Sequence, residues 1–191
     1  ALLAALDLRR DLILAGVRPP VLALPLGAQR LADPRLAEDL AEARLPRGAL
    51  ALVLDDAAAL AAAGSAARWT MERLCDLGVA IEVESFGAGP VDVATLQTLR
   101  PARVGLGPRF VRPALESAER RALLAAMAET LRRLGAEPVA RGVPGEDAAA
   151  RLAEAGLALM EGEGLAPPLA PEALAARLAP SPGVDRARAR V

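Results

Sequence analysis

Three charged residues, Glu84, Arg141 and Glu161, stand where apolar runs of the sequence end, and side chains at such positions can do chemistry. Two convergent carboxylates could act as general acid and general base, or bind a divalent cation. A buried arginine must itself be paired, and its planar fork can bridge two carboxylates. We therefore expect Arg141 to lie between Glu84 and Glu161 as an internal cation, and Arg141→Ala to destabilise the fold by about 3 kcal/mol.

The composition narrows the chemistry further. The 191 residues include no His, Lys, Asn or Tyr, so the commonest general base, the Schiff-base amine and the commonest metal ligand are missing. A net charge of -1 and an aromatic content of 2% offer neither a basic nor a stacking surface for nucleic acid. We expect no nucleic-acid partner and no cofactor.

Cys75 is the single cysteine, which excludes an internal disulfide and favours a reducing compartment, so we expect a cytoplasmic location. Its neighbours Met71, Leu74 and Leu77 predict a small buried core residue rather than a nucleophile. The sequence shows no signal peptide and no uncharged apolar run of about 18 residues, so we expect no membrane contact by this segment. Because the chain begins with Ala, we interpret it as a piece of a longer protein, and an upstream membrane anchor remains an alternative.

The elements that must position these side chains alternate along the chain. Short apolar runs bounded by Gly, Pro and Asp predict strands at about 21–26, 49–54, 79–84, 102–106, 137–141 and 157–160. Amphipathic spacing predicts helices at about 2–15, 34–43, 57–76, 91–98, 114–134, 145–155 and 171–178. Strands that are apolar along their whole length indicate a parallel sheet covered on both faces.

This alternation fits a doubly wound sheet and a (β/α) barrel almost equally well. Residues 1–178 are predicted to form one domain, which is shorter than the roughly 250 residues of a complete eight-stranded barrel. Residues 179–191 are rich in Pro and Arg and are predicted to be a tail or linker.

The order of the strand ends carries a resemblance to a known family. Four segments of the sequence are, in order, Val79-Ala-Ile-Glu-Val-Glu-Ser-Phe-Gly, Gly105-Leu-Gly, Ala140-Arg-Gly-Val-Pro and Glu161-Gly-Glu. They follow one another as the motifs Asp-Asp-Phe-Gly, Lys-Ile-Asp, Ala-Glu-Gly-Val-Glu and Gln-Gly-Tyr do in the EAL-domain phosphodiesterases of bacterial cyclic-di-GMP signalling. The sequence resembles that family over roughly residues 10–178. The resemblance implies a TIM-like (β/α) barrel, incomplete, with about six parallel strands visible.

The residues at the family's active-site positions differ from its motifs, and the resemblance therefore implies an inactive domain without a bound metal ion. Metal-binding or catalytic side chains of the family are replaced at eight positions, namely Pro25, Val53, Glu84, Ser85, Gly105, Arg141, Pro144 and Glu161. The turn with Phe86, Gly87, Gly89 and Pro90 matches the loop that couples the family's active site to dimerisation. We expect the segment from Phe86 to Leu96 to form an interface.

Further positions have structural interpretations. Phe110 and Val111 match a Phe-Val pair of the family and are expected in the core. Asp56 precedes an apolar helical run, which favours a helix N-cap over a metal-binding pair with Asp55.

Three functions follow from these observations. The first is a degenerate EAL-like domain that binds a protein partner or forms a homodimer in a bacterial signalling or regulatory protein. The second is a receptor that binds cyclic-di-GMP without cleaving it, in which arginines meet the phosphates: Arg103, Arg109, Arg112 and Arg141. The third is an enzyme, either an active phosphodiesterase, which the replaced residues oppose, or an unrelated barrel enzyme that uses Glu84 and Glu161 as acid and base.

Overall fold

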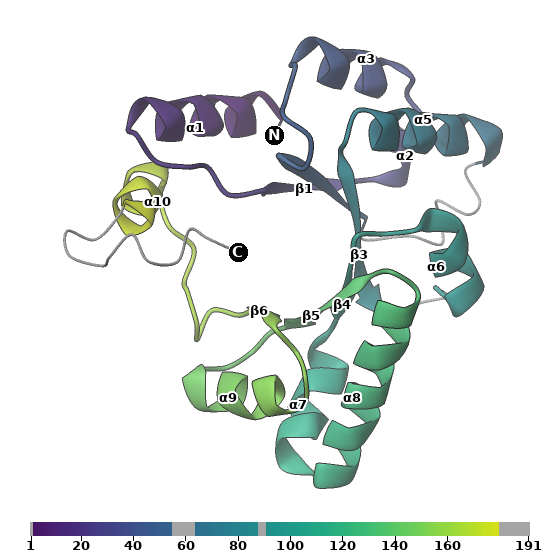
Figure 1. Cartoon of the computed structure of the whole chain (residues 1–191), viewed down its shortest axis with the longest axis vertical. Coiled ribbons are helices and arrows are strands. Elements are labelled where there is room, and N and C mark those ends of the chain that lie inside the picture. Colours follow the sequence, from purple (N-terminus) through teal and green to yellow (C-terminus); the bar gives the residue numbers. More distant parts are fainter. Residues whose placement is uncertain (1, 55–63, 88–90, 180–191) are drawn as a thin grey trace. The chain divides into compact units, whose positions relative to one another are not determined.

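A computed structural model of the protein describes residues 2–54, 64–87 and 91–179. Its centre is one sheet of six strands in sequence order, each parallel to its neighbours: β1 Leu22–Leu26, β2 Leu50–Leu54, β3 Ala80–Phe86, β4 Arg103–Leu106, β5 Glu137–Arg141 and β6 Leu159–Glu161. The sheet curls into half a barrel, which Figure 1 shows opening to one side. The predicted incomplete, TIM-like barrel is confirmed, and it excludes the doubly wound alternative.

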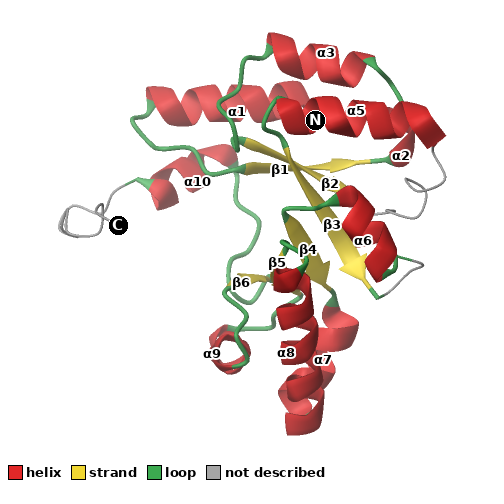
Figure 2. Cartoon of the chain, turned by 45° about the vertical axis from the view of Figure 1, so that its right-hand side comes forward, coloured by secondary structure: helices red, strands yellow, loops and turns green. Residues whose placement is uncertain are grey.

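The helices that follow the strands lie on the convex side of this sheet (Figure 2). They are α2 Ala28–Leu31, α3 Arg35–Glu42, α5 Gly64–Asp76, α6 Val93–Leu99, α7 Pro108–Glu116, α8 Ala118–Arg133 and α9 Glu146–Glu154. Because neighbouring strands are parallel, each connection between two strands must bring the chain back to the end of the sheet where the previous strand began, as in a βαβ unit. The predicted N-cap at Asp56 lies outside the described residues.

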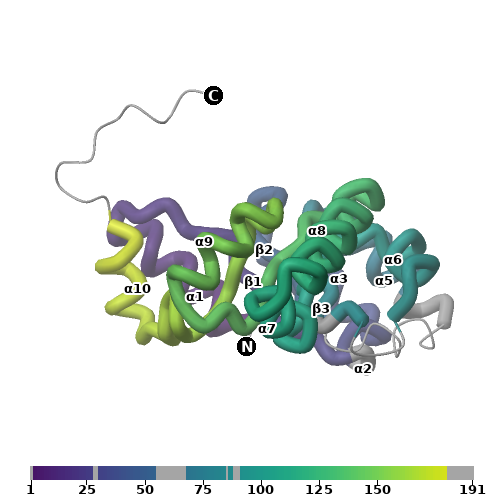
Figure 3. Tube along the Cα trace, turned by 90° about the horizontal axis from the view of Figure 1, so that it is seen from below, coloured from purple at the N-terminus to yellow at the C-terminus, as the bar shows by residue number. Residues whose placement is uncertain are grey.

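Two helices occupy the segment for which one was expected. Pro108 opens α7 at its first turn, where a missing N–H costs nothing, and the helix ends at Ser117, whose hydroxyl accepts a hydrogen bond from the Arg120 N–H and caps α8. Figure 3 shows α7 and α8 packed side by side. The predicted helix at 114–134 covers α8 and only the last turn of α7, so most of α7 was not predicted.

The core lies between the sheet and these helices. Every residue of β2 is buried, as expected for a strand covered on both faces, and Leu74, Leu106 and Leu131 are among the fully buried side chains. Burying such a side chain contributes about 1.5–3 kcal/mol. This apolar layer holds the strands in register and thereby fixes which side chains share the inner face.

Proline limits the length of β6. Glu137 donates its N–H to Ala102 across β4, so Pro138 and Ala140 direct their backbone groups toward β6. Pro138 has no N–H to donate, and the pairing of β5 with β6 begins only at Val139. The last strand is therefore three residues long.

The position of Cys75 contradicts the sequence analysis. This residue is exposed on α5, because Met71 and Leu74 form the buried face and the next position is rotated by about 100° around the helix. Partial burial raises the pKa of the Cys75 thiol, and the nearby charges of Asp76 and Glu72 raise it further. A nucleophilic thiolate is thus disfavoured for an electrostatic reason.

The chain divides into two compact units, of which Val21–Pro167 contains the sheet. The other combines the residues up to Pro20 with those from Pro168 and contains α1 Leu2–Leu14 and α10 Pro171–Leu178. Within α1, Ala5 and Leu12 are buried. The expectation of one domain over residues 1–178 stays a prediction. In the part of the chain that the structure describes, no helix combines the length and apolar character needed to cross a membrane.

Candidate functional site

The inner face of the half-barrel carries the candidate site. Because side chains alternate along a strand, every second residue of each strand points to this face. Residues from all six strands line a cavity of about 520 Å³ on this face, within the size range of small-molecule pockets. The lining residues are Ala23, Pro25, Val53, Glu82, Glu84, Arg103, Val139, Arg141, Leu159, Met160 and Glu161.

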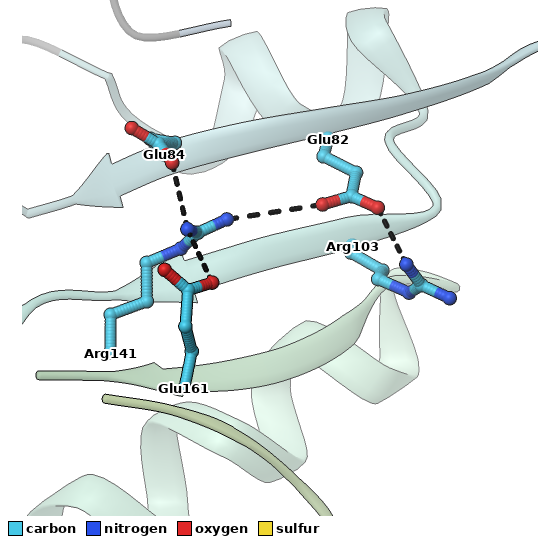
Figure 4. A network of polar contacts seen from close by, with 5 residues as sticks. All are labelled: Glu82, Glu84, Arg103, Arg141 and Glu161. Atoms are coloured by element: carbon cyan, nitrogen blue, oxygen red, sulfur yellow. Dashed lines mark hydrogen bonds and ion pairs between the residues drawn. The ribbon is translucent and has the colours of Figure 1, made fainter. Parts of the chain in front are cut away.

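Arg141 lies at the centre of a charged cluster on this face (Figure 4). Its Nη1 is 2.8 Å from Glu84 Oε1 and 2.8 Å from Glu161 Oε2, and it donates a hydrogen bond to the latter. The side chain of Arg141 is 17% exposed, against 33% for Glu84 and 64% for Glu161. The expected position of Arg141 between the two carboxylates is confirmed.

Glu82 is the member of this cluster that the sequence analysis missed. Its side chain is only 5% exposed; Oε1 is 2.6 Å from Arg103 Nη1, and Oε2 is 3.9 Å from Arg141 Nη2. A buried carboxylate needs such partners, because an unpaired buried charge is strongly destabilising. The sequence does contain a sign of this role, because Glu82 interrupts an apolar strand two residues before Glu84. In the structure, Glu82 stands opposite Arg103 in the register of β3 and β4.

Gly105 explains how Arg141 can reach β3. The strand order places β4 between the two, and the alternation that turns Arg103 inward also places Gly105 on the inner face. Gly105 has no side chain, so the arginine can cross β4 to the carboxylates of Glu82 and Glu84. The family-position residue Gly105 is thus buried within β4, where it leaves room for the cluster.

The cluster is not fully satisfied. Arg141 Nε is buried and has no hydrogen-bond partner among the described residues, which costs about 1–3 kcal/mol. The three carboxylates of Glu82, Glu84 and Glu161 face the two guanidinium groups, so the cluster carries a formal charge of -1. Each guanidinium group of the cluster is thus paired with at least one carboxylate and is not free to bind a substrate.

The remaining residues at the predicted active-site positions do not belong to the charged cluster. Pro25 and Val53 lie on the inner face and stand opposite each other in the register of β1 and β2. Ser85 belongs to β3 where its pairing with β4 becomes irregular, and its side chain lies outside the described part of the structure. Pro144 is exposed in the loop after β5.

Two glycines hold the loop after β6 close to the loop after β5. A Cβ on Gly162 would overlap the backbone of Val143, and one on Gly164 would overlap the backbone of Pro144. The Val143 N–H also donates to the Glu161 carbonyl oxygen at 3.0 Å. This contact fixes the end of β6, from which Glu161 reaches Arg141.

Part of the predicted interface loop is described. Phe86 ends β3 and is half-buried, while Gly87 adopts a φ of 74° and packs so closely on the Phe110 ring that a Cβ would overlap it. Arg109 Nη1 donates to the Gly87 carbonyl oxygen at 3.3 Å. Gly89 and Pro90 lie outside the described residues.

The expected core positions after β4 are confirmed only for Val111. That residue is fully buried, whereas Phe110 is half-buried because its ring lies over the turn at Gly87.

Comparison with known proteins identifies the family. The family model of the EAL domain matches residues 2–168, and the chain therefore belongs to the EAL family. No curated protein matches the chain. The EAL domain of Mycobacterium smegmatis DcpA has a similar structure, with a TM-score of 0.81 and 23% identity over 92% of this chain and 81% of that one.

Similar structures that contain the nucleotide include those of FimX and BlrP1. The EAL domain of FimX from Pseudomonas aeruginosa, bound to cyclic-di-GMP, has a TM-score of 0.69 and 21% identity over 82% of this chain and 66% of that one. Klebsiella pneumoniae BlrP1, in a calcium and cyclic-di-GMP complex, has a TM-score of 0.69 and 23% identity over 83% of this chain. This chain covers 40% of BlrP1. At these identities the likeness establishes the shared fold.

Proposed function

We propose that this EAL domain does not hydrolyse cyclic-di-GMP and that it acts by binding a protein, either a partner or a second copy of itself, in a bacterial signalling protein. The observation that carries the proposal is the guanidinium of Arg141 held at 2.8 Å from both Glu84 and Glu161. A side chain with a fixed positive charge occupies the place between two carboxylates where a divalent cation would have to bind.

The donor set does not fit a divalent metal ion. Such an ion needs convergent oxygen ligands, whereas Pro25 and Val53 contribute no side-chain oxygen to the inner face. Among the residues described, no group of three or more Asp, Glu, Cys or His side chains is arranged to hold an ion. Without a metal ion there is no Lewis acid to polarise a phosphodiester and no metal-bound hydroxide to attack it.

The retained scaffold supports a binding role. A fold can keep its packed core and its surfaces while the site on it loses its chemistry. The turn at Gly87 keeps a backbone conformation and a close contact with Phe110 that only glycine accommodates. On this proposal, the segment from Phe86 to Leu96 is the surface through which the domain dimerises or meets its partner.

The second candidate is a receptor that binds cyclic-di-GMP without cleaving it. It is favoured by the cavity of about 520 Å³ and by the nucleotide bound in FimX and BlrP1. It is opposed by the pairing of Arg103 and Arg141 with carboxylates, since these cations are not free for phosphates. Of the other two arginines proposed for phosphate contact, Arg109 donates to the Gly87 carbonyl oxygen and Arg112 is exposed on α7.

Calorimetric titration with cyclic-di-GMP, with and without Mg²⁺ or Mn²⁺, separates these functions when it is followed by a turnover assay that detects the linear dinucleotide. An active EAL phosphodiesterase serves as the positive control. The proposal expects neither heat of binding nor product. Binding without product would select the receptor, and product formation that disappears in Glu84→Gln would refute the proposal.

Sedimentation at several protein concentrations tests self-association. Gly87→Val, which strains the turn, should then weaken a dimer, and Arg133→Ala on the exposed face of α8 is the matched surface control.

A further inference from the structure

Two helices around the sheet end on an arginine in a backbone conformation that suits glycine. A residue at or just after a helix end often takes the left-handed conformation, and glycine does so without strain, as Gly135 after α8 and Gly156 after α9 do. Arg44 after α3 and Arg100 after α6 take it with φ of 47° and 46°. The Arg44 N–H donates to the Ala41 carbonyl oxygen at 3.2 Å and closes the last turn of α3. A side chain at these two positions strains the backbone, so an arginine there costs stability that glycine would keep.

Arg44, unlike Arg100, lines an apolar recess. The recess lies at the amino ends of β2 and β3, where α3 and α5 pack side by side (Figure 2). Its volume is about 50 Å³, several times the roughly 10–15 Å³ that admits one water molecule. Leu40, Leu45 and Val79 are among its lining residues, and Arg44 brings the one charged side chain to the lining, all of which belongs to the described chain. The recess therefore has room for a small aliphatic side chain next to a cation.

The Arg44 cation is exposed and unpaired. Among the residues that the structure describes, its guanidinium forms no hydrogen bond and no ion pair, and neither Glu42 nor Asp76 pairs with it. Arg47 lies three residues further along the same loop, and its Nη1 donates to the Asp76 carbonyl oxygen at 2.6 Å. A neutral acceptor leaves the positive charge of Arg47 without a counter-charge. Two cations thus stand beside the recess, and no described carboxylate is bound to either of them.

The wall of the recess is fixed by close packing between two loops. A Cβ on Gly78 would overlap the backbone of Arg47, and the Gly48 N–H donates to the Gly78 carbonyl oxygen at 2.8 Å. These contacts tie the loop before β2 to the loop before β3. A preformed recess of this kind spares its ligand the entropic cost of ordering the loops that it contacts.

We propose that this recess binds a segment of a partner protein in which an aliphatic side chain stands next to an acidic one. The aliphatic side chain fills the recess, and its burial supplies part of the affinity. The neighbouring carboxylate pairs with Arg44, which orients the segment, and the charge of Arg47 adds to the attraction. This role accounts for the strain at Arg44, because a glycine would suit the backbone but bring no cation to the recess.

The inference goes beyond the proposed function. The recess lies at the amino ends of the strands, whereas the segment from Phe86 to Leu96 follows the carboxyl end of β3. Turnover of cyclic-di-GMP would refute the proposed inactivity and leave this site unaffected. Failure of the peptide experiment below would refute the recess site and leave the hydrolysis result unchanged.

The probe is a blocked pentapeptide, Gly-Val-Glu-Glu-Gly, titrated into the isotope-labelled full chain and followed by amide chemical shifts. We expect saturable shifts at Leu45 and Gly78. Arg44→Gly should weaken binding at least about fivefold, which corresponds to about 1 kcal/mol. The matched control is Arg100→Gly, which relieves the same backbone strain at a residue that does not line the recess and should bind as the wild type does. Neither variant should have a lower Tm than the wild type, since glycine adopts the left-handed conformation freely.

Two further peptides test the two halves of the ligand on the wild-type protein. Gly-Ser-Glu-Glu-Gly lacks the aliphatic side chain and Gly-Val-Gln-Gln-Gly lacks the carboxylates, and both should lose the saturable shifts. Binding of the original peptide should also weaken as salt rises, because the paired charges are exposed. Absence of shifts at Leu45 and Gly78, or equal affinities of the wild type and Arg44→Gly, would overturn the inference. A Tm of Arg44→Gly well below that of Arg100→Gly would also overturn it, because Arg44 would then serve the fold.

Discussion

Replacing Arg141 with Ala should destabilise the protein by about 2 kcal/mol. The pair with Glu161 contributes about 0.5 kcal/mol because that carboxylate is mostly exposed, and the pair with the half-buried Glu84 about 1 kcal/mol. Leaving the buried Glu82 with one cation instead of two costs about 1.5 kcal/mol, less than an isolated buried charge because Arg103 remains 2.6 Å away. Removing the unpaired Nε offsets about 1 kcal/mol of this loss.

Urea unfolding followed by circular dichroism measures this change, which corresponds to about 4–8 °C in Tm for a chain of this size. The control is Arg133→Ala, whose guanidinium is 79% exposed and bonds to Glu129 at 2.9 Å. That variant should change the free energy of unfolding by no more than about 0.5 kcal/mol. Equal stabilities of the Arg141 and Arg133 variants would refute the view that Arg141 is an internal cation.

Three further predictions follow from the structure. Gly162→Ala and Gly164→Ala should each lower Tm, because the added methyl overlaps the backbone of Val143 or Pro144, whereas Gly107→Ala, which meets no atom within 4 Å, should change Tm little. Cys75 should react with iodoacetamide with an apparent pKa above that of an ordinary thiol, and Asp76→Asn should lower this value; an apparent pKa below the ordinary one would contradict the electrostatic argument. The Thr95 N–H and hydroxyl donate to the Asp92 carboxylate and lower its pKa, so the stability that this cap contributes is present above the ordinary carboxyl pKa and is lost as the pH falls through the lowered value. The Tm difference between the wild type and Asp92→Ala, measured from pH 7 downward, should therefore shrink in acid. A Tm difference that stays constant would contradict this role of Asp92.

The fold could be predicted from the sequence because its signals are local. Each strand is an apolar run ended by Gly, Pro or a charged residue, so the observed strands begin and end within about two residues of their predicted bounds. The sequence pattern alone could not predict whether the sheet curls into a barrel, because it fits an open, doubly wound sheet equally well. The resemblance to EAL domains in the order of the strand ends favoured the barrel.

The candidate site was predicted in part. Arg141, Glu84 and Glu161 were placed together because each stands at or next to the end of a predicted strand, and the carboxyl ends of parallel strands lie at the same end of the sheet. Glu82 was missed because it lies inside a strand, and only the register of β3 with β4 shows that Arg103 neutralises it. Cys75 was misplaced because apolar neighbours in sequence do not share a helix face with it.

The central claim is that Arg141 occupies the position between Glu84 and Glu161 that a metal ion would need. A crystal of the protein soaked in Mn²⁺, with data collected near the manganese absorption edge, tests it most directly. The account predicts density for the Arg141 guanidinium between the two carboxylates and no anomalous peak beside them. An anomalous peak coordinated by Glu84, with the guanidinium displaced into solvent, would contradict it.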